Sequence, residues 1–305
     1  MSVIKKYLSL VKFSHTIFAM PFALIGFFLA AKNFHLFDNT YVVWKTNWGS
    51  TIYSKKYLLI IFTLVILCMI FARSAAMAFN RWLDAKYDAL NPRTAIREIP
   101  AGVISSRNAL VFTILSSIFF ILTTYFINTA CLILAPIALF IILFYSYTKR
   151  FTALCHLVLG VGLGLAPIGA YLAVTGSFDL LPILFSFTVL FWVSGFDIIY
   201  ALQDVDFDRS QKLHSIPAAF GKAKALRVSE LLHLLSAIAV VSAGVYGHFG
   251  WLYWIGVAVF IGMLIYQHSI VKPNDLSKVN IAFMTANGIA SVVFAMFVLL
   301  DIFIN

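Results

Sequence analysis

The sequence predicts an all-α, polytopic membrane protein built as a bundle of nine transmembrane helices. The first reason is composition, because the 305 residues are 62% hydrophobic and only 11% charged, well outside the range of soluble domains. The second is the length of the apolar runs, since about 20 residues are needed to cross some 30 Å of hydrocarbon. The third is that Leu, Phe, Ile and Ala fill these runs without the alternation of a membrane barrel.

The apolar runs set the expected helices in order along the chain. We expect spanning helices near residues 16–32, 57–79, 108–127, 129–146, 155–175, 180–201, 226–247, 250–270 and 279–301. The first run is too long, and lacks the small-residue cleavage site, for a removable signal peptide, so we expect it to stay as an anchor. The aromatic and polar loop 33–56 is typical of a segment at head-group depth.

The distribution of Lys and Arg predicts the orientation. Seventeen of the 22 fall in the N-terminus and in the loops that share its side, and four fall on the other side. Because cytoplasmic loops retain positive charge, the N-terminus is expected in the cytoplasm and the C-terminus outside, as in a bacterial inner membrane. The net charge of +10 is explained by this topology and by anionic lipid, and no nucleic-acid motif accompanies it.

The chain is expected to form a single domain over residues 1–305, with cytoplasmic cap loops at about 81–107 and 202–226. A weak internal repeat supports this. Two spans each run into an acidic motif, then a basic stretch, then a proline-marked entry to the next span, "REIPAG" or "HSIPAAFG". Two halves facing a shared cavity are the simplest account of such a repeat.

The two acidic motifs have matched spacing. Asn80, Asp84 and Asp88 are spaced i, i+4, i+8, and so would line one helix face. The second motif repeats this spacing at Tyr200, Asp204 and Asp208.

Seven of the twelve acidic residues lie in these two stretches. An acid within a membrane costs on the order of 3 kcal/mol, and stacked acids repel, so the clusters need a cause. Oxygen ligands without His or Cys favour Mg²⁺, which takes the rest of its shell from phosphates. The cations that could meet those phosphates are Arg93, Arg97, Lys149, Arg150 and Lys212. The alternative is that the acids belong to ordinary helix ends and solvated loops.

The two motifs resemble those of the UbiA superfamily of intramembrane prenyltransferases. The family pattern N-x-x-x-D-x-x-x-D matches Asn80, Asp84 and Asp88, and Y-x-x-x-D-x-x-x-D matches the second motif. The likeness extends to "VKFSHTIFAMPFALIG", "YSYTKRFTALCHLVLGVGLGLAPIGA" and "GFDIIYALQDVDFD", and it is closest to the 4-hydroxybenzoate polyprenyltransferase branch.

The resemblance implies nine helices around a central cavity that is capped by the acidic loops and open to lipid. It implies that the motifs hold Mg²⁺, which binds the diphosphate of an allylic polyprenyl donor. The donor would ionise to an allylic cation in a dry pocket, and an electron-rich ring, 4-hydroxybenzoate, would attack it ortho to the hydroxyl. A carboxylate would take the ring proton in a step of quinone biosynthesis.

The resemblance also implies roles for single residues. Asp84, Asp88, Asp204, Asp208 and Tyr200 would be catalytic, and Asn80 would join the four aspartates as metal ligands. The substrate-binding set would be Asn80, Lys12, Arg73, Arg93, Arg97, Lys149, Arg150, Asp197 and Lys212. Arg150 matches a position expected to meet the acceptor carboxylate or the diphosphate. For Lys12, Arg73 and Arg150, the alternatives are snorkelling to the interface or pairing with an internal acid.

Other polar and small residues receive structural interpretations. His156, His214 and His233 lack metal-ligand partners and are expected to be structural, and the three cysteines are expected to be buried hydrophobes. The glycines of "GVGLGLAPIG" are expected to allow close helix packing or a kink at Pro167.

The sequence leaves alternative functions open. The acceptor could be a menaquinone-pathway compound, of futalosine type or dihydroxynaphthoate. An ion-coupled transporter is another class, although it would place its charges within the spans rather than at their ends. Phosphatidyl-alcohol transferases and soluble prenyl synthases are excluded because the chain lacks D-G-x-x-A-R and D-D-x-x-D. The expected partners are a polyprenyl diphosphate, an aromatic acceptor and membrane lipid, and no obligatory protein partner is evident.

Overall fold

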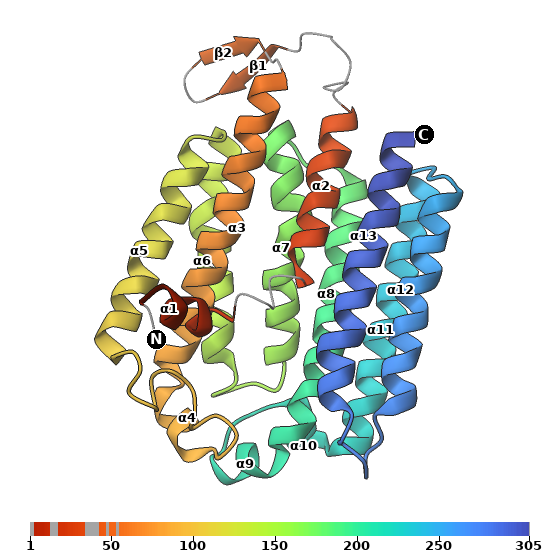
Figure 1. Ribbon diagram of the computed structural model, residues 1–305. Coiled ribbons are helices and arrows are strands. Elements are labelled where there is room, and N and C mark those ends of the chain that lie inside the picture. The colour runs from red at the N-terminus through yellow and green to blue at the C-terminus, as the bar shows by residue number, and fades with distance from the viewer. Residues whose placement is uncertain (1–2, 13–17, 34–42, 47–48, 53–54, 305) are drawn as a thin grey trace.

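The computed structural model describes residues 3–12, 18–33, 43–46, 49–52 and 55–304 (Figure 1). The long apolar helices are α2 (Met20–Asn33), α3 (Lys55–Leu83), α5 (Ser106–Tyr125), α6 (Thr129–Thr148), α7 (Cys155–Thr175), α8 (Leu180–Ala201), α11 (Lys222–Tyr246), α12 (Trp251–Ile270) and α13 (Asn287–Ile304). The short helices are α1 (Val3–Leu10), α4 (Ala85–Leu90), α9 (Val205–Ser210) and α10 (Ile216–Phe220). A 3-10 turn, η2 (Leu202–Asp204), follows α8, and a π-helix, η3 (Ile281–Ala286), leads into α13.

The predicted all-α membrane bundle is confirmed. Eight helices in the described part of the chain are long and apolar enough to cross a membrane. The ninth predicted span appears as α2, whose described apolar stretch Met20–Lys32 is shorter than a full crossing, and residues 13–17 before it lie outside the described ranges. The predicted count of nine is therefore approximate.

A small hairpin adds to the helices in the loop where we expected an interfacial segment. Strands β1 (Val43–Thr46) and β2 (Gly49–Ile52) pair antiparallel, with Val43 opposite Ile52. The hairpin lies at the end of the bundle opposite the short helices α4, α9 and α10 (Figure 1). Most of the rest of loop 33–56 lies outside the described residues.

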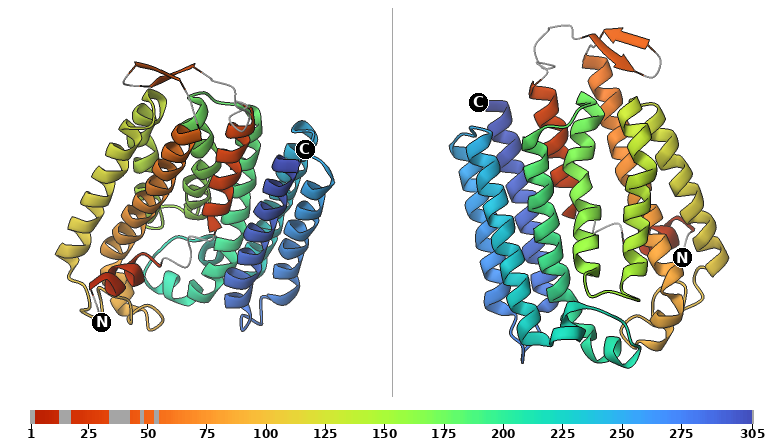
Figure 2. Two further views of the ribbon diagram at one scale, coloured as in Figure 1. Left: turned by 45° about the horizontal axis from the view of Figure 1, so that its top comes forward. Right: turned by 180° about the vertical axis from the view of Figure 1, so that it is seen from behind.

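Helices α7 and α8 form the middle of the bundle. Helix α7 packs against α8, α2 and α6, and α8 packs also against α11. Helices α3, α5 and α6 stand on one side and α11, α12 and α13 on the other, as both views in Figure 2 show. The aromatic core fills the space among α2, α8, α12 and α13, with Phe22, Trp192, Phe260 and Phe294 fully buried.

Polar side chains fix the helix ends. Asn128 caps α6 by accepting a hydrogen bond from the Cys131 amide, while its own amide donates to the carbonyls of Leu172 and Ala173 in the last turn of α7. Asp301 of α13, only 1% exposed, accepts from backbone amides at the start of α12. Buried polar residues far from the acidic motifs thus satisfy backbone groups that lipid could not.

The glycines of α7 divide into two groups. Gly160 and Gly164 lie against α8, where an added Cβ would come within 2.2 Å of the Ser194 hydroxyl and 2.9 Å of the Ser186 carbonyl, so their predicted packing role is confirmed. Gly162 and Gly169 face more open space, and a Cβ on Gly169 would meet no atom within 4 Å.

The tightest crossing joins α2 to α7. A Cβ on Gly26 would lie 2.0 Å from the Pro167 carbonyl oxygen, which is a backbone atom and cannot turn aside. We expect Gly26→Ala to lower the free energy of unfolding by about 1–3 kcal/mol, because two backbones must separate. Thermal unfolding of the detergent-purified protein measures this. Gly169→Ala is the matched control on α7, and equal melting temperatures for the two variants would contradict the assignment.

Candidate active site

The two acidic motifs lie at the same end of the bundle, at the ends of α3 and α8. Asp84 directly follows α3, and Asp204 ends the turn after α8, with nearly the same backbone angles (φ −93°, ψ 5° and φ −107°, ψ 7°). A short helix follows each, α4 with Asp88 and α9 with Asp208. The chain thus bends at each middle aspartate instead of continuing as one straight helix. In the first motif, hydrogen bonds from Asp84 N to Asn80 O and from Asp88 N to Asp84 O keep the predicted i, i+4, i+8 register.

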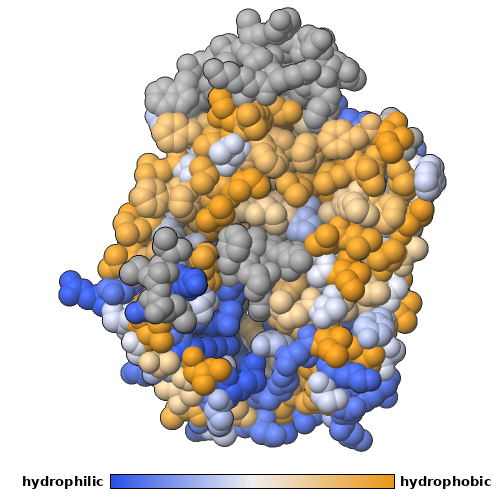
Figure 3. Space-filling model, in the orientation of Figure 1, coloured by the Kyte–Doolittle hydropathy of each residue, from blue (hydrophilic) through white to orange (hydrophobic). Residues whose placement is uncertain are grey.

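A cavity of about 870 Å³ begins beneath these motifs and runs into the bundle. Its cap end is polar, and Figure 3 shows hydrophilic residues around a hollow near that end, with apolar residues over most of the face above. Its deeper walls come chiefly from α3, α6 and α7 and extend as far as Phe178, beyond the last turn of α7. The cavity therefore joins a charged mouth to an apolar channel.

Nearly all of the predicted site residues line this cavity. They are Lys12, Arg73, Asn80, Asp84, Asp88, Arg93, Arg97, Lys149, Arg150, Asp197, Tyr200, Asp204 and Asp208. Lys212 does not: it is exposed, lies outside the cavity lining, and has a left-handed backbone (φ 54°) in the turn after α9. The structure thus separates Lys212 from the residues with which it was grouped.

In the first motif each aspartate pairs with an arginine. Arg150, from the loop after α6, donates through Nη2 to Asp84 Oδ1 at 2.9 Å, and the Asn80 amide donates to Asp84 Oδ2 at 3.1 Å. Arg97 donates to Asp88 Oδ1 at 2.6 Å. The side chain of Asp88 is 7% exposed, so this pair is largely shielded from water.

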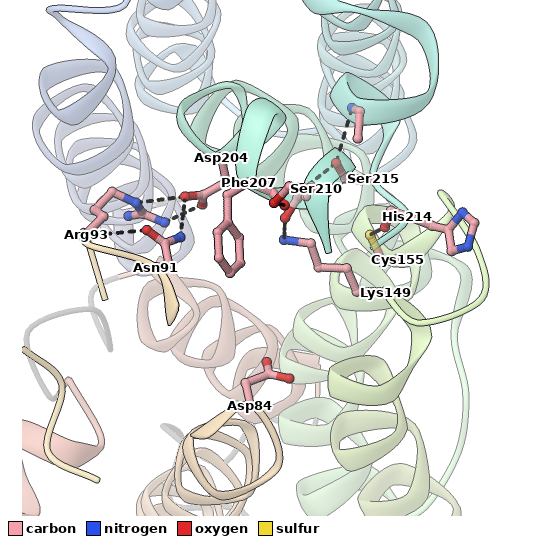
Figure 4. Close-up of polar contacts among 12 residues, drawn as sticks. Asp84, Asn91, Arg93, Lys149, Cys155, Asp204, Phe207, Ser210, His214 and Ser215 are labelled. Atoms are coloured by element: carbon pink, nitrogen blue, oxygen red, sulfur yellow. Dashed lines mark hydrogen bonds and ion pairs between the residues drawn. The ribbon is translucent and has the colours of Figure 1, made fainter. Parts of the chain in front are cut away.

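The second motif is paired in the same way, but its partners come from the first half of the chain. Arg93 forms a two-point ion pair with Asp204, and its Nη1 donates to the Tyr200 hydroxyl at 2.8 Å. Lys149 lies 2.7 Å from Asp208 Oδ1, while the Ser215 hydroxyl donates to Oδ2 of that fully buried carboxylate at 2.9 Å. In Figure 4, Arg93 and Asn91 meet Asp204 on one side of the cap, and Lys149 lies on the other side.

Burial and pairing act together on the charges of the cap. Burial raises the pKa of Asp84, although Arg150 opposes this by favouring the carboxylate. Burial lowers the pKa of Lys149, but the Asp208 carboxylate outweighs it, so this pKa lies above its ordinary value. Burial likewise opposes the charge of Arg93, and its hydrogen bond to Asp204 raises its pKa overall. Arg93 and Lys149 therefore remain charged in their ion pairs.

The donor set fits a hard divalent cation that shares its shell with a ligand. The atoms of the two motifs that could ligate a metal are all oxygens. One of them, Asp88 Oδ2, is buried without a hydrogen-bond partner. Within the described ranges, however, no three acidic, His or Cys side chains come close enough to hold an ion by themselves. A Mg²⁺ ion there would complete its coordination with water and with the oxygens of a phosphate group.

The structure adds site residues that the sequence did not single out. Asn91 donates to Asp204 Oδ1 at 3.1 Å and accepts from the Arg93 amide, so it aligns the Arg93 pair. Glu98, which also lines the cavity, accepts a hydrogen bond from Ser9 of α1. Because these partners are separated by about a hundred residues, no local pattern could have indicated them.

The structure places the three histidines differently. His156 lines the cavity and places Nδ1 2.7 Å from Asp197 Oδ2. His233 is buried against His268 and the Trp192 carbonyl among the helices, as a structural residue would be. His214 is exposed, and Figure 4 shows its ring pointing away from the acids.

Comparison with known proteins agrees with the motifs. The model of the UbiA prenyltransferase family matches residues 19–289, which is most of the chain. The chain belongs to the UbiA prenyltransferase family. The predicted assignment as a membrane-embedded prenyltransferase enzyme is thereby confirmed.

Individual relatives and structures support the family membership. The chain is 28% identical to a 4-hydroxybenzoate octaprenyltransferase of Nitrosospira multiformis, over 85% of this chain and 89% of the relative. It is 29% identical to one of Nitrosomonas eutropha, over 83% and 89%. The apo structure of a UbiA homolog from Aeropyrum pernix K1 matches with a TM-score of 0.75 and 28% identity, over 95% of this chain and 97% of that one. A UbiA homolog from Archaeoglobus fulgidus, bound to DMAPP and Mg²⁺, shares the fold with a TM-score of 0.70 at 20% identity, over 98% of this chain and 100% of that one.

The two-point pair between Arg93 and Asp204 can be tested within this prenyltransferase. We expect Arg93→Lys to lower kcat/KM by about 10- to 100-fold, because an ammonium group cannot contact both Asp204 oxygens and Tyr200, and charged hydrogen bonds contribute about 1.5–3 kcal/mol each. Product formation in purified membranes measures this. Arg107→Lys, at an exposed position outside the cavity lining, is the control. Unchanged kinetics for the Arg93 variant would remove the pair from the site.

Proposed function

We propose that this enzyme transfers a polyprenyl chain from an allylic polyprenyl diphosphate to 4-hydroxybenzoate, at the ring carbon ortho to the hydroxyl, in quinone biosynthesis. The observation that carries the proposal is the cavity itself, in which four acid and cation pairs stand at the mouth of an apolar channel. A diphosphate would bind at the charged mouth, and a long isoprenoid chain would lie in the apolar channel. The names of the curated relatives support both the acceptor and an octaprenyl-length donor.

The diphosphate is expected to bind by an exchange of partners at the cap. Arg93, Arg97, Lys149 and Arg150 hold the motif carboxylates as the structure stands. The carboxylates and Asn80 would hold Mg²⁺, and the freed cations would turn to the diphosphate oxygens. Bound Mg²⁺ supplies positive charge that stabilises the departing diphosphate. In support, the Archaeoglobus homolog is described as bound to DMAPP and Mg²⁺ and, in another structure, to GPP and Mg²⁺.

The apolar channel would protect the allylic cation once the carbon–oxygen bond breaks. The described cavity wall carries Phe18, Phe120, Phe178, Phe196, Phe207 and Phe283 together with many aliphatic side chains. Such a wall excludes water, which would otherwise quench the cation to an alcohol. The ring of the acceptor can then attack, and its π-electrons form the new carbon–carbon bond.

Arg73 is the proposed partner of the acceptor carboxylate. It lies seven residues before Asn80 on α3, hence about 10 Å deeper in the bundle. Its Nη2 donates to the Lys12 carbonyl at 2.9 Å, which fixes the guanidinium, and its buried Nε has no hydrogen-bond partner. A carboxylate arriving in the cavity would satisfy that donor.

The chain is proposed to work as one domain in a bacterial inner membrane, with the two caps and the N-terminus in the cytoplasm. The loops at the cap end carry most of the Lys and Arg, and α13 ends at the opposite end of the bundle (Figure 1). The C-terminus would therefore lie outside.

The function is tested with a panel of acceptors. Membranes containing the protein are incubated with Mg²⁺, labelled octaprenyl diphosphate, and either 4-hydroxybenzoate, dihydroxynaphthoate or a futalosine-type compound, and the product is identified by mass. We expect 3-octaprenyl-4-hydroxybenzoate, and loss of product after chelation with recovery on adding Mg²⁺. A product from another acceptor alone would replace the proposed acceptor. Cation-driven flux in liposomes without transfer would favour a transporter instead.

The channel predicts where the donor chain runs. Gly169 lies thirteen residues after His156 on α7, about 20 Å deeper, and an added Cβ would project into open cavity. We expect Gly169→Leu to lower kcat/KM for octaprenyl diphosphate about tenfold, the equivalent of some 1.4 kcal/mol, while geranyl diphosphate is used as before. Competition between the two donors measures this. Gly169→Ala is the control, and an equal loss for both donors would place the chain elsewhere.

A further inference from the structure

His156 and Asp197 form a polar pair below the cap. His156 is in the first turn of α7 and Asp197 is in α8, and their side chains meet at 2.7 Å between Nδ1 and Oδ2. Asp197 lies seven residues before Asp204, so it is about 10 Å deeper in the bundle than the paired acids of the cap. Both residues line the cavity, and neither belongs to the four ion pairs of the cap.

The surroundings of His156 fix its ring and its proton. The residue is 2% exposed, and the backbone amide of Ile216, at the start of α10, points at Nε2 from 3.4 Å. A carboxylate oxygen can only accept, so Nδ1 carries a proton and donates to Asp197 Oδ2. The hydroxyl of Ser194 holds the His156 carbonyl at 3.1 Å, which ties this turn of α7 to α8.

This contact leaves Asp197 able to act as a base. Its side chain is 26% exposed although its partner is buried, because the carboxylate faces the cavity. Asp84, Asp88, Asp204 and Asp208 are each held in an ion pair with a guanidinium or ammonium group of the cap. Asp197 is held by His156 through Oδ2, which leaves its other oxygen for a proton from a group in the cavity.

We propose that His156 is a positioning residue that holds Asp197 as the acceptor of the proton released from the aromatic ring. This inference rests on the proposed function. The bond between the donor carbon and diphosphate breaks, and the electron pair leaves with the diphosphate. The ring π-electrons form the carbon–carbon bond. The ring carbon then loses its proton to the free oxygen of Asp197, and the electrons of that C–H bond restore aromaticity. The proton returns to water when the product leaves.

The contact suits Asp197 both before and after the transfer. His156 donates to Oδ2 whether that oxygen belongs to a carboxylate or is the carbonyl oxygen of a carboxylic acid. The incoming proton is therefore directed to the other oxygen of this cavity-lining carboxylate. A purely structural histidine would tie α7, α8 and α10 together without affecting proton removal, so the two roles predict different kinetics.

The test compares variants of the full-length protein in membranes, using 4-hydroxybenzoate with and without deuterium at the ring positions ortho to the hydroxyl. His156→Leu removes the donor, and His156→Asn is too short to reach Asp197. We expect either variant to lower kcat about 100-fold, within the usual contribution of proton transfer, with KM for the donor unchanged. Proton removal should then limit the rate, so the deuterated acceptor should react roughly twofold or more slowly, whereas the wild type shows almost no difference.

Two further variants complete the design. His156→Gln keeps an N–H that can reach Asp197, and we expect it to restore most of kcat and to abolish the isotope effect. His214→Leu, at an exposed histidine outside the cavity lining, should match the wild type. If His156→Leu does not accumulate in membranes, His156→Asn provides the same measurement.

The outcomes separate this inference from the proposed function. A loss of kcat in the His156 variants without an isotope effect would make the residue merely structural, and wild-type kinetics would remove its role altogether; either result overturns the inference while leaving the proposed function intact. If the wild-type protein prenylates no acceptor of the panel, the proposed function fails, and the inference falls with it.

Discussion

The pairing of four buried or half-buried carboxylates with four cations is the interaction on which the site depends. Acids at the edge of a low-dielectric bundle are costly unless they are paired, and the pairs also join distant parts of the chain. Arg93 crosses from the first cap loop to Asp204, and Lys149 crosses from the α6–α7 loop to Asp208. The same contacts therefore close the cap, and under the proposed function they hold its cations where a diphosphate would bind.

The bundle separates two chemical environments within one cavity. Close approach of α7 to α2 and α8, made possible by Gly26, Gly160 and Gly164, brings the centre of the bundle together. Gly162 and Gly169 on the same helix face more open space and widen the cavity. The ion pairs thus stand at the mouth, Arg73 and Asp197 lie about 10 Å below them, and the deeper walls of the cavity are largely apolar.

Much of the architecture could be predicted from the sequence because a membrane restricts the backbone to closed hydrogen-bonding patterns. Eight of the nine expected spans appear as full crossings, and the acids with matched spacing do lie together. The pairing of the acids could not be predicted, since Asn91 and Asp204 are separated by 113 residues. Lys212 is close to Asp208 in sequence, yet it lies outside the cavity lining.

The sequence by itself determined that this chain crosses a membrane repeatedly and that two acidic motifs of matched spacing follow apolar helices. These properties follow from composition and local spacing, because hydrocarbon selects apolar helices. Only the tertiary structure decided which cation neutralises which acid, that His156 faces Asp197, and which face of α7 is packed or open. Those contacts join helices far apart in the chain, and their geometry depends on how the helices pack.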